Sequence, residues 1–211
     1  EECIDPTFVS AGGHAFGMGN GALGSITRTD VRLLAVKPES LTFEGIATLP
    51  ITWTTVHVAL SRAQVSSRHR LLVHAAAGGV GLKATEYAHW LQLRATASAG
   101  GRHKHQQLTW LGVEAGFSSR DVGAFSHGLS AVSNASRLCA VLNSLSHDFI
   151  SSSLALLCEH GAFKEIGKRG IWAKSRHSSA ASHSAYFPIA IDADLAEDPG
   201  WMHRLLHRLA Q

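Results

Sequence analysis

The feature that most constrains the fold of this chain is a short apolar strand that ends in a turn of small residues and continues as a helix. The stretch runs from Leu71 to Gly81 and reads LLVHAAAGGVG. From Ala76 onward it follows the pattern A-x-G-x-x-G, which is the dinucleotide-binding pattern G-x-G-x-x-G with alanine in the first position. Such a turn presents the free N–H groups and the positive end of the helix to an anion. The sequence therefore predicts a seat for the pyrophosphate of a dinucleotide.

Each small residue of this turn has a predicted role. Ala76 turns the chain without bulk, Gly78 lets the backbone approach the phosphates, and Gly81 lets the helix pack closely on its strand. Gly79 and Val80 are assigned to the same cofactor-binding turn. A purely structural joint between a strand and a helix uses small residues as well, so the turn alone leaves that alternative open.

The rest of the chain repeats the alternation of apolar strands and amphipathic helices. We expect helices over 51–63, 80–92, 102–111 and 149–157, and strands over 71–75, 94–98, 115–117, 138–143, 162–166 and 187–191. A last helix should follow Asp198-Pro199, and the serine-rich stretch 175–184 reads as an exposed connection. This alternation is typical of an α/β fold whose parallel sheet is covered on both faces.

The first 50 residues have a different texture. Glycines separate short strand-like pieces, of which 27–36 is the longest, and Lys37-Pro38 closes the segment. We expect strand-and-turn structure that is too short to form a core of its own.

The end of the second predicted strand indicates which dinucleotide the turn would bind. An acidic residue there would contact the 2'-hydroxyl of NAD, but the stretch from Ala97 to Lys104 contains no carboxylate. Ser98, Arg102 and Lys104 can hold a phosphate instead, so NADPH is favoured. The alternative is that both cations only face solvent on the first turn of the next helix, a position that helix dipoles disfavour for cations.

Composition excludes several other classes of function. With 211 residues and a formal charge of +3, the chain has scattered basic residues, and we expect no nucleic acid partner. The 14 histidines lie mostly singly, and Cys3, Cys139 and Cys158 lack C-x-x-C spacing, so we expect neither a metal site nor a disulfide framework. Because neither a signal sequence nor a membrane-spanning run is evident, we expect a soluble, cytoplasmic protein without a membrane partner.

Seven separated segments carry a family resemblance. The chain resembles the enoyl reductase domain of modular polyketide synthases and animal-type fatty acid synthases, a zinc-free branch of the medium-chain dehydrogenase/reductase superfamily that is related to quinone oxidoreductases. The segments are GMGNGALGS (17–25), KPESLTFEGIATLP (37–50), WTTV (53–56), HAAAGGVG (74–81), LGVEAGFSSRD (111–121), VLNSL (141–145) and FKEIGKRGI (163–171). They follow the order of the family.

The resemblance implies a Rossmann-type doubly wound parallel sheet over 51–211, preceded by a partial, β-rich, GroES-like substrate domain over 1–50. It implies NADPH-dependent reduction of a trans-2-enoyl thioester on an acyl carrier protein, with hydride transfer to the β-carbon and other domains of a multidomain synthase as partners. Lys168 matches the family's active-site lysine, and Asp192 matches its partner aspartate. Further positions that match the cofactor cleft are Thr54, Thr55, Asn143, Ser144 and Leu145.

The resemblance also implies that part of the substrate domain is missing from both ends of the sequence. Two alternatives therefore stand beside an active enoyl reductase. One is a truncated remnant that binds NADPH without turnover, and the other is a free-standing enzyme like the quinone oxidoreductases. The segments at 111–121 and 141–145 favour the synthase branch.

Overall fold

The computed structural model of the chain describes residues 9–21, 24–133 and 137–211. Contacts within the chain define two compact units, one made of Glu1–Thr54 with Ala190–Gln211 and the other of Thr55–Ile189. The predicted assignment of residues 1–50 to a substrate domain and of 51–211 to a coenzyme domain concerns what these parts do, and it stays a prediction.

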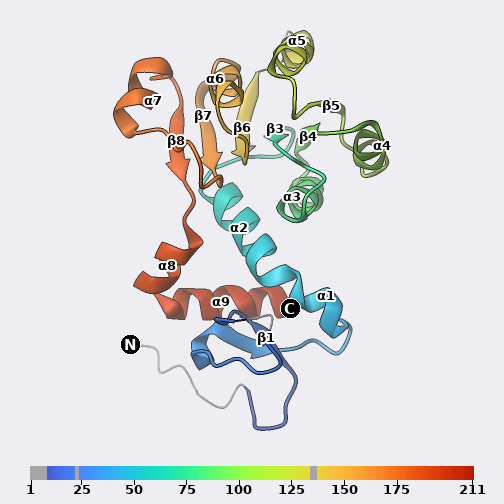
Figure 1. Cartoon of the computed structure of the whole chain (residues 1–211), viewed down its shortest axis with the longest axis vertical. Coiled ribbons are helices and arrows are strands. Elements are labelled where there is room, and N and C mark those ends of the chain that lie inside the picture. Colours follow the sequence, from blue (N-terminus) through green and yellow to red (C-terminus); the bar gives the residue numbers. More distant parts are fainter. Residues whose placement is uncertain (1–8, 22–23, 134–136) are drawn as a thin grey trace. The chain divides into compact units, whose positions relative to one another are not determined.

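The larger unit contains a parallel sheet of six strands (Figure 1). The strands are β3 (Arg70–Val73), β4 (Arg94–Ala99), β5 (Ala115–Ser118), β6 (Leu138–Asn143), β7 (Leu157–Glu165) and β8 (Ala185–Pro188), and their order in the sheet is β5-β4-β3-β6-β7-β8. The chain winds outward from β3 in one direction and then returns to wind outward from β6 in the other. This order is that of the Rossmann fold, and it confirms the predicted doubly wound sheet.

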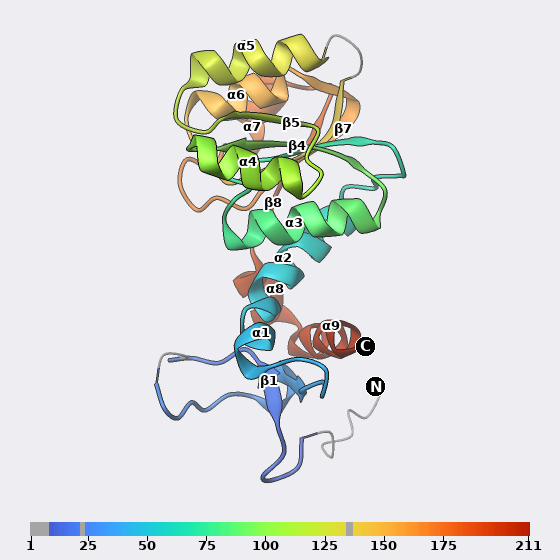
Figure 2. The same ribbon diagram turned by 90° about the vertical axis from the view of Figure 1, so that its right-hand side faces the viewer.

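Helices cover both faces of this sheet (Figure 2). On one face, α3 (Gly79–Trp90) packs on β3 and β4, and α4 (Arg102–Trp110) packs on β4 and β5. On the other face, α5 (Val122–Ser133) packs on β5 and on α6 (Asp148–Leu154), which also contacts β7. Right-handed crossovers between parallel strands require this division, because each βαβ unit places its helix on a face set by its direction along the sheet.

The core of the larger unit lies between the sheet and the pair α5 and α6. Its buried members include Leu72, Val141 and Phe163 from the strands and Phe125 and Ile150 from the helices. All four residues of β3 are buried, as expected for a central strand of a sheet with two covered faces. Burial of these side chains is the main driving force for this unit.

Several predicted elements are wrong in type or extent. The stretch 175–184, predicted as an exposed connection, is mostly exposed, but Lys174–Ala180 forms helix α7 and buries His177. The strand predicted over 27–36 is reduced to Leu34–Val36, after a short 3-10 helix at Val31–Leu33. The strand predicted over 187–191 already ends at Pro188, and Ile191 begins helix α8 (Ile191–Glu197).

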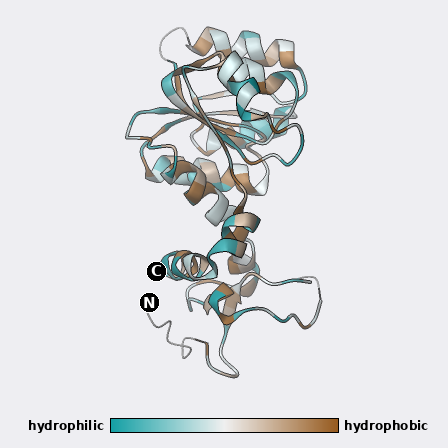
Figure 3. Cartoon of the chain, turned by 90° about the vertical axis from the view of Figure 1, so that its left-hand side faces the viewer, coloured by the Kyte–Doolittle hydropathy of each residue, from teal (hydrophilic) through white to brown (hydrophobic). Residues whose placement is uncertain are grey.

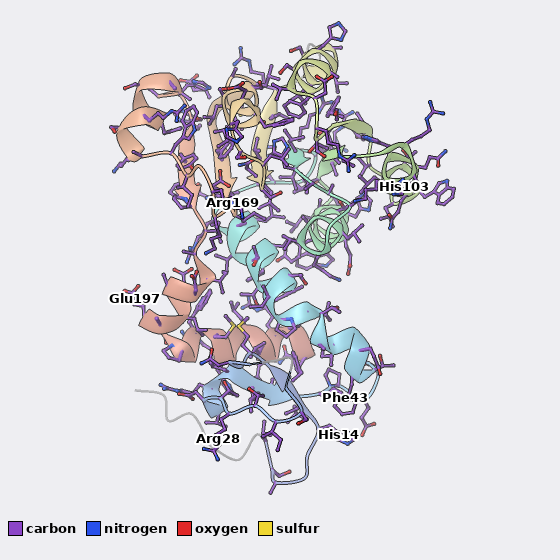
Figure 4. The ribbon with its side chains drawn as sticks, viewed as in Figure 1. His14, Arg28, Phe43, His103, Arg169 and Glu197 are labelled. Carbon is purple, nitrogen blue, oxygen red and sulfur yellow. The ribbon has the colours of Figure 1, made fainter. Side chains whose placement is uncertain are left out.

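The smaller unit is built around a two-stranded sheet. Strand β1 (Ala15–Gly17) pairs with β2 (Leu34–Val36) in antiparallel fashion. Helix α1 (Phe43–Ala47) follows, and the Phe43 ring meets the edge of the His14 ring at a centroid distance of 5.1 Å (Figure 4). Helix α2 (Leu49–Ser61) begins in this unit and ends in the larger one.

The last helix, α9 (Pro199–Ala210), closes the smaller unit. The Asp198 carboxylate accepts the Trp201 N–H at 3.0 Å, which confirms the predicted helix start at Asp198-Pro199. Met202, Leu205 and Leu206 are buried, and the helix packs on β2 and on the preceding 3-10 turn. Its hydrophobic and hydrophilic residues take separate sides, as expected for a surface helix (Figure 3).

One buried charge stands out in the larger unit. Lys164 on β7 is fully buried, and its Nζ donates to the carbonyl of Arg62, just after α2, at 2.7 Å. The same Nζ lies 3.7 Å from the centroid of the Phe187 ring. Burial, and secondly the neighbouring Arg62 charge, lower the pKa of Lys164 to about 8. The folded chain therefore holds this ammonium at a cost in free energy.

We predict that Lys164→Met stabilises the chain at pH 7. Since the folded-state pKa of Lys164 lies below its ordinary value, its contribution to stability is least below about pH 8 and increases as the pH rises toward 10. Removing the ammonium should raise the free energy of unfolding at pH 7 by about 1–3 kcal/mol. Urea unfolding of both proteins at pH 7 and at pH 10 measures the free energy of unfolding. A variant that is less stable than the wild type at pH 7 would show that the buried ammonium stabilises the fold.

Candidate functional site

The turn after β3 has no room for a larger residue at its last glycine. A Cβ atom on Gly81 would lie 2.6 Å from the carbonyl carbon of Ala76, and Ala76 itself is fully buried. Ala75 adopts a left-handed backbone with φ of 49°, which bends the chain out of the strand. Gly81 thus allows α3 to pack closely on the turn, as the sequence predicts.

The outer side of the turn is open. Gly78 is the N-cap of α3 and is exposed, and a Cβ atom there would meet only the Ala75 carbonyl oxygen, at 3.3 Å. No side chain caps this end of α3, so the amides of its first turn face outward without a side-chain acceptor. A pyrophosphate fits here, because its oxygens can accept these N–H groups and its charge is stabilised by the helix dipole.

A buried histidine fastens the turn to its neighbours. His74 is bonded through Nδ1 to the Ser98 hydroxyl at 3.0 Å and through Nε2 to the Ser153 hydroxyl at 2.9 Å. Ser153 donates to the Phe149 carbonyl, so its oxygen accepts from Nε2, and Ser98 donates to Nδ1. Complete burial lowers the pKa of His74 to about 3 and keeps the ring neutral.

These bonds change the interpretation of Ser98. The residue is fully buried, its hydroxyl serves His74, and it also accepts the Ala75 N–H at 3.2 Å. This geometry is that of a residue that holds the turn in shape. The direct phosphate contact predicted for Ser98 stays a prediction that these hydrogen bonds do not support.

A surface hollow of about 510 Å³ lies between α4 and the carboxyl-terminal parts of β4 and β5. Its lining includes Gly101 and Arg102 at the start of α4, together with Ser118 at the end of β5. Lys104 is exposed on the first turn of α4, and His103 points away from the ribbon toward solvent (Figure 4). The structure thus places Arg102 at the hollow and Lys104 on the adjoining surface.

Sequence reasoning missed a third cation at this place. Arg120 follows β5, and a Cβ atom on Gly100 would lie 2.8 Å from its Nε. The guanidinium therefore packs directly against Gly100, which follows β4 at the place where the ribose of a dinucleotide is held in this fold. The segment 111–121 that carries the family resemblance contains Arg120, but nothing in the sequence showed that this side chain folds back over β4.

A second polar cluster lies at the ends of β6 and β7. Asn143 is fully buried, its Nδ2 donates to the Glu165 carboxylate and to the Leu145 carbonyl, both at 2.7 Å, and its Oδ1 accepts the Leu145 N–H. Ser144 donates from its hydroxyl to the His74 carbonyl at 3.2 Å. The structure thus joins the predicted residues 143–145 to the phosphate turn through Ser144.

The predicted catalytic residues lie in different units. Lys168 is exposed in the loop after β7, in the larger unit, and Asp192 is exposed in the first turn of α8, in the smaller one. Their pairing therefore stays a prediction. Thr54 and Thr55 are adjacent on α2 and both are buried. The Thr54 hydroxyl has no hydrogen-bond partner among the residues that the structure describes, so it retains bonding capacity for a ligand.

Over residues 9–21, 24–133 and 137–211, no three side chains of the histidine, cysteine, aspartate and glutamate types gather in a way that could hold a metal ion. In the same described ranges, no helix has the length and apolar character needed to cross a bilayer.

Proteins that resemble this chain in sequence include polyketide synthases. No family model matches the chain. It is 36% identical over 181 residues to the pikromycin polyketide synthase component PikAII of Streptomyces venezuelae. The matched residues make up 84% of this chain and 5% of that protein. The chain is 34% identical over 171 residues to the highly reducing polyketide synthase ZEA2 of Gibberella zeae. The matched residues make up 79% of this chain and 7% of that protein. The chain thus spans a small part of these multidomain relatives.

Solved structures extend the likeness to three dimensions. CurK enoyl reductase is 34% identical with a TM-score of 0.81, and the match covers 88% of this chain and 55% of that one. The nucleotide-binding subdomain of the PpsC enoyl reductase domain from Mycobacterium tuberculosis is 26% identical with a TM-score of 0.69, and the match covers 76% of this chain and 91% of that one. By sequence the chain is similar to polyketide synthases, and by fold it is similar to their enoyl reductase domains.

Proposed function

We propose that the chain binds NADPH at the carboxyl ends of β3, β4 and β6 and takes part in the reduction of a trans-2-enoyl thioester. The observation that carries this proposal is the open, uncapped start of α3 at the point where the strand order reverses. In doubly wound sheets this crevice is where dinucleotides bind. The likeness to CurK enoyl reductase and to the nucleotide-binding subdomain of the PpsC enoyl reductase domain supports the same site.

Different residues bind different parts of the coenzyme. The first-turn amides of α3, from Gly79 to Gly81, bind the pyrophosphate, and Gly78 leaves space for its approach. Arg102 and Arg120 bind the 2'-phosphate, with Lys104 adding charge nearby. Thr54 and Thr55 on α2 and the loop 143–145 border the nicotinamide end.

When bound, the coenzyme supplies a hydride to the β-carbon of the substrate. Negative charge then develops on the thioester oxygen, and the Lys168 ammonium stabilises it and holds a proton for the α-carbon. Asp192 would orient the ammonium. The substrate is carried on an acyl carrier protein, the partners are other domains of a cytoplasmic synthase, and no metal takes part.

Two alternative functions are distinguished by experiment. A remnant that binds coenzyme without turnover would show NADPH binding and no oxidation with a crotonyl thioester. A quinone reductase would oxidise NADPH with a quinone and not with the thioester. The chain spans about half the length of the solved enoyl reductase CurK, so activity itself is the property to measure.

The pyrophosphate seat predicts a charge effect at Gly78. An aspartate there can cap α3, so Gly78→Asp should fold with an unchanged or higher melting temperature. Its carboxylate occupies the position of the anion, and the Kd for NADPH should rise about tenfold or more above that of the neutral control Gly78→Asn. Nicotinamide fluorescence titration measures both constants, and equal values for the two variants would place the pyrophosphate elsewhere.

The cations at the end of β4 predict coenzyme preference. Arg120→Gln should weaken NADPH binding about 10- to 100-fold, because a charge-assisted bond to phosphate is lost, and should leave NADH binding unchanged. Lys174→Gln on α7 is the matched control for removal of one positive charge. A parallel loss of NADPH and NADH affinity in Arg120→Gln would contradict a contact with the 2'-phosphate.

The proposed role of Lys168 predicts an effect on turnover alone. Lys168→Met should lower kcat for crotonyl thioester reduction about 10- to 100-fold and leave the Kd for NADPH within about twofold, because the ammonium acts on the substrate. The neighbouring exposed cation gives a control, Arg169→Gln, that should retain activity. Equal loss in both variants would point to a general charge effect of the loop.

A further inference from the structure

The glutamate that precedes the Lys168 loop has surroundings that are unusual for a carboxylate. Glu165 is the last residue of β7 and is 1% exposed. Its Oε1 accepts the Gly167 N–H and its Oε2 accepts from Asn143 Nδ2, both at 2.7 Å. One carboxylate therefore spans two loops, the one that follows β6 and the one that leads to Lys168.

The hydrogen-bond directions in this cluster are fixed. Both Nδ2 hydrogens of Asn143 are used, by Glu165 and by the Leu145 carbonyl, and its Oδ1 accepts the Leu145 N–H at 3.1 Å. The backbone adds a further link, because the Ile166 N–H donates to the Asn143 carbonyl at 2.9 Å. Each carboxylate oxygen of Glu165 thus faces a donor, and an added proton on the carboxyl group would displace one of these bonds.

Space at this point is also restricted. A Cβ atom on Gly167 would lie 2.7 Å from Glu165 Oε1, so any side chain at residue 167 would require the carboxylate to move. The backbone one residue before Lys168 is thereby held at a defined position.

The charges that face Glu165 are few. Tyr186 on β8 is near enough that the Glu165 charge adds to the effect of burial in raising the pKa of the phenol. Lys168 and Arg169 follow in the same loop, the neighbours from β6 are the uncharged Asn143 and Leu145, and Lys164 is bonded to Arg62 instead. Burial raises the pKa of Glu165 to about 7, although both hydrogen bonds oppose this shift.

We infer that Glu165 is a positioning residue, whose carboxylate, bonded to Asn143 and to the Gly167 amide, sets the place of Lys168 relative to the coenzyme loop 143–145. This inference rests on the proposed function of Lys168. The carboxylate form makes both bonds. Protonation below about pH 7 removes one of them and loosens the Lys168 loop.

The test exchanges the hydrogen-bond donor and acceptor between the side chains of Asn143 and Glu165. Glu165→Gln has one carbonyl oxygen for two donors, so its NH₂ opposes either Asn143 Nδ2 or the Gly167 N–H and breaks that bond. In either case the loop is no longer held at both points, and the Gly167 amide is less protected from solvent. The double variant Asn143→Asp with Glu165→Gln restores a bond between the same atoms, with donor and acceptor exchanged. The first readout is the Gly167 amide in ¹⁵N NMR spectra of the full chain between pH 5.5 and 8.5.

The amide readout does not depend on enzymatic activity. In the wild-type chain the Gly167 amide should titrate with a midpoint near pH 7 and exchange slowly with solvent above it. Glu165→Gln should abolish the titration and speed amide exchange about tenfold or more, and the double variant should restore slow exchange. An amide that does not titrate, or a single variant with unchanged exchange, overturns the inference, whatever the chain does with substrate.

The kinetic readout tests the connection to Lys168. With crotonyl thioester, Glu165→Gln should lower kcat about 10- to 100-fold and change the Kd for NADPH by less than about twofold, and the double variant should recover most of kcat. A wild-type chain that binds NADPH without turnover refutes the proposed function and leaves the amide readout to decide the positioning. Unchanged kcat in Glu165→Gln, in an active chain, overturns the role toward Lys168.

Discussion

The close approach of α3 to the end of β3 is the contact on which the rest of the larger unit depends. It exists because Gly81 has no side chain to meet the backbone of Ala76. With α3 held there, its amino end is aimed outward beyond the sheet, and β4 and β5 are laid down on one side of β3 while β6 to β8 occupy the other. The reversal of strand order and the anion-binding end of the helix therefore arise at one point of the chain.

Around this point the structure uses buried polar groups in place of apolar packing. His74, Ser98 and Ser153 form one cluster and Asn143 and Glu165 form another, and the Ser144 hydroxyl links the second to the first. Networks of this kind rigidify a site only when every member is satisfied, and each of these side chains has a hydrogen-bond partner. The carboxyl ends of four neighbouring strands are thereby connected by side chains.

The sequence was informative where short-range pattern determines structure. The strand at 138–143 and the helix that follows Asp198-Pro199 come directly from apolar runs and capping residues, and the order of strands and helices was enough to predict the sheet. The helix α7 was missed because serines dominate it, and its stability comes from contacts such as that of His177 with Tyr186. Long-range contacts explain the site residues that were missed as well, since Arg120 and Glu165 take their roles from neighbours on other strands.

Lys164 and Glu165 are consecutive on β7 and are bonded through their side chains to different partners, Arg62 for the lysine and Asn143 for the glutamate. The folded pKa of the glutamate is raised to about 7, so its contribution to stability is lost as the pH rises through that value. The folded pKa of the lysine is lowered to about 8, so its contribution is lost as the pH falls through that value. Taken by themselves, these two neighbours give a minimum of stability near neutral pH. On the acid side His74 opposes Glu165, because its pKa is lowered to about 3 and unfolding binds a proton at His74 while it releases one from Glu165. On the alkaline side unfolding is accompanied by proton uptake at Lys164.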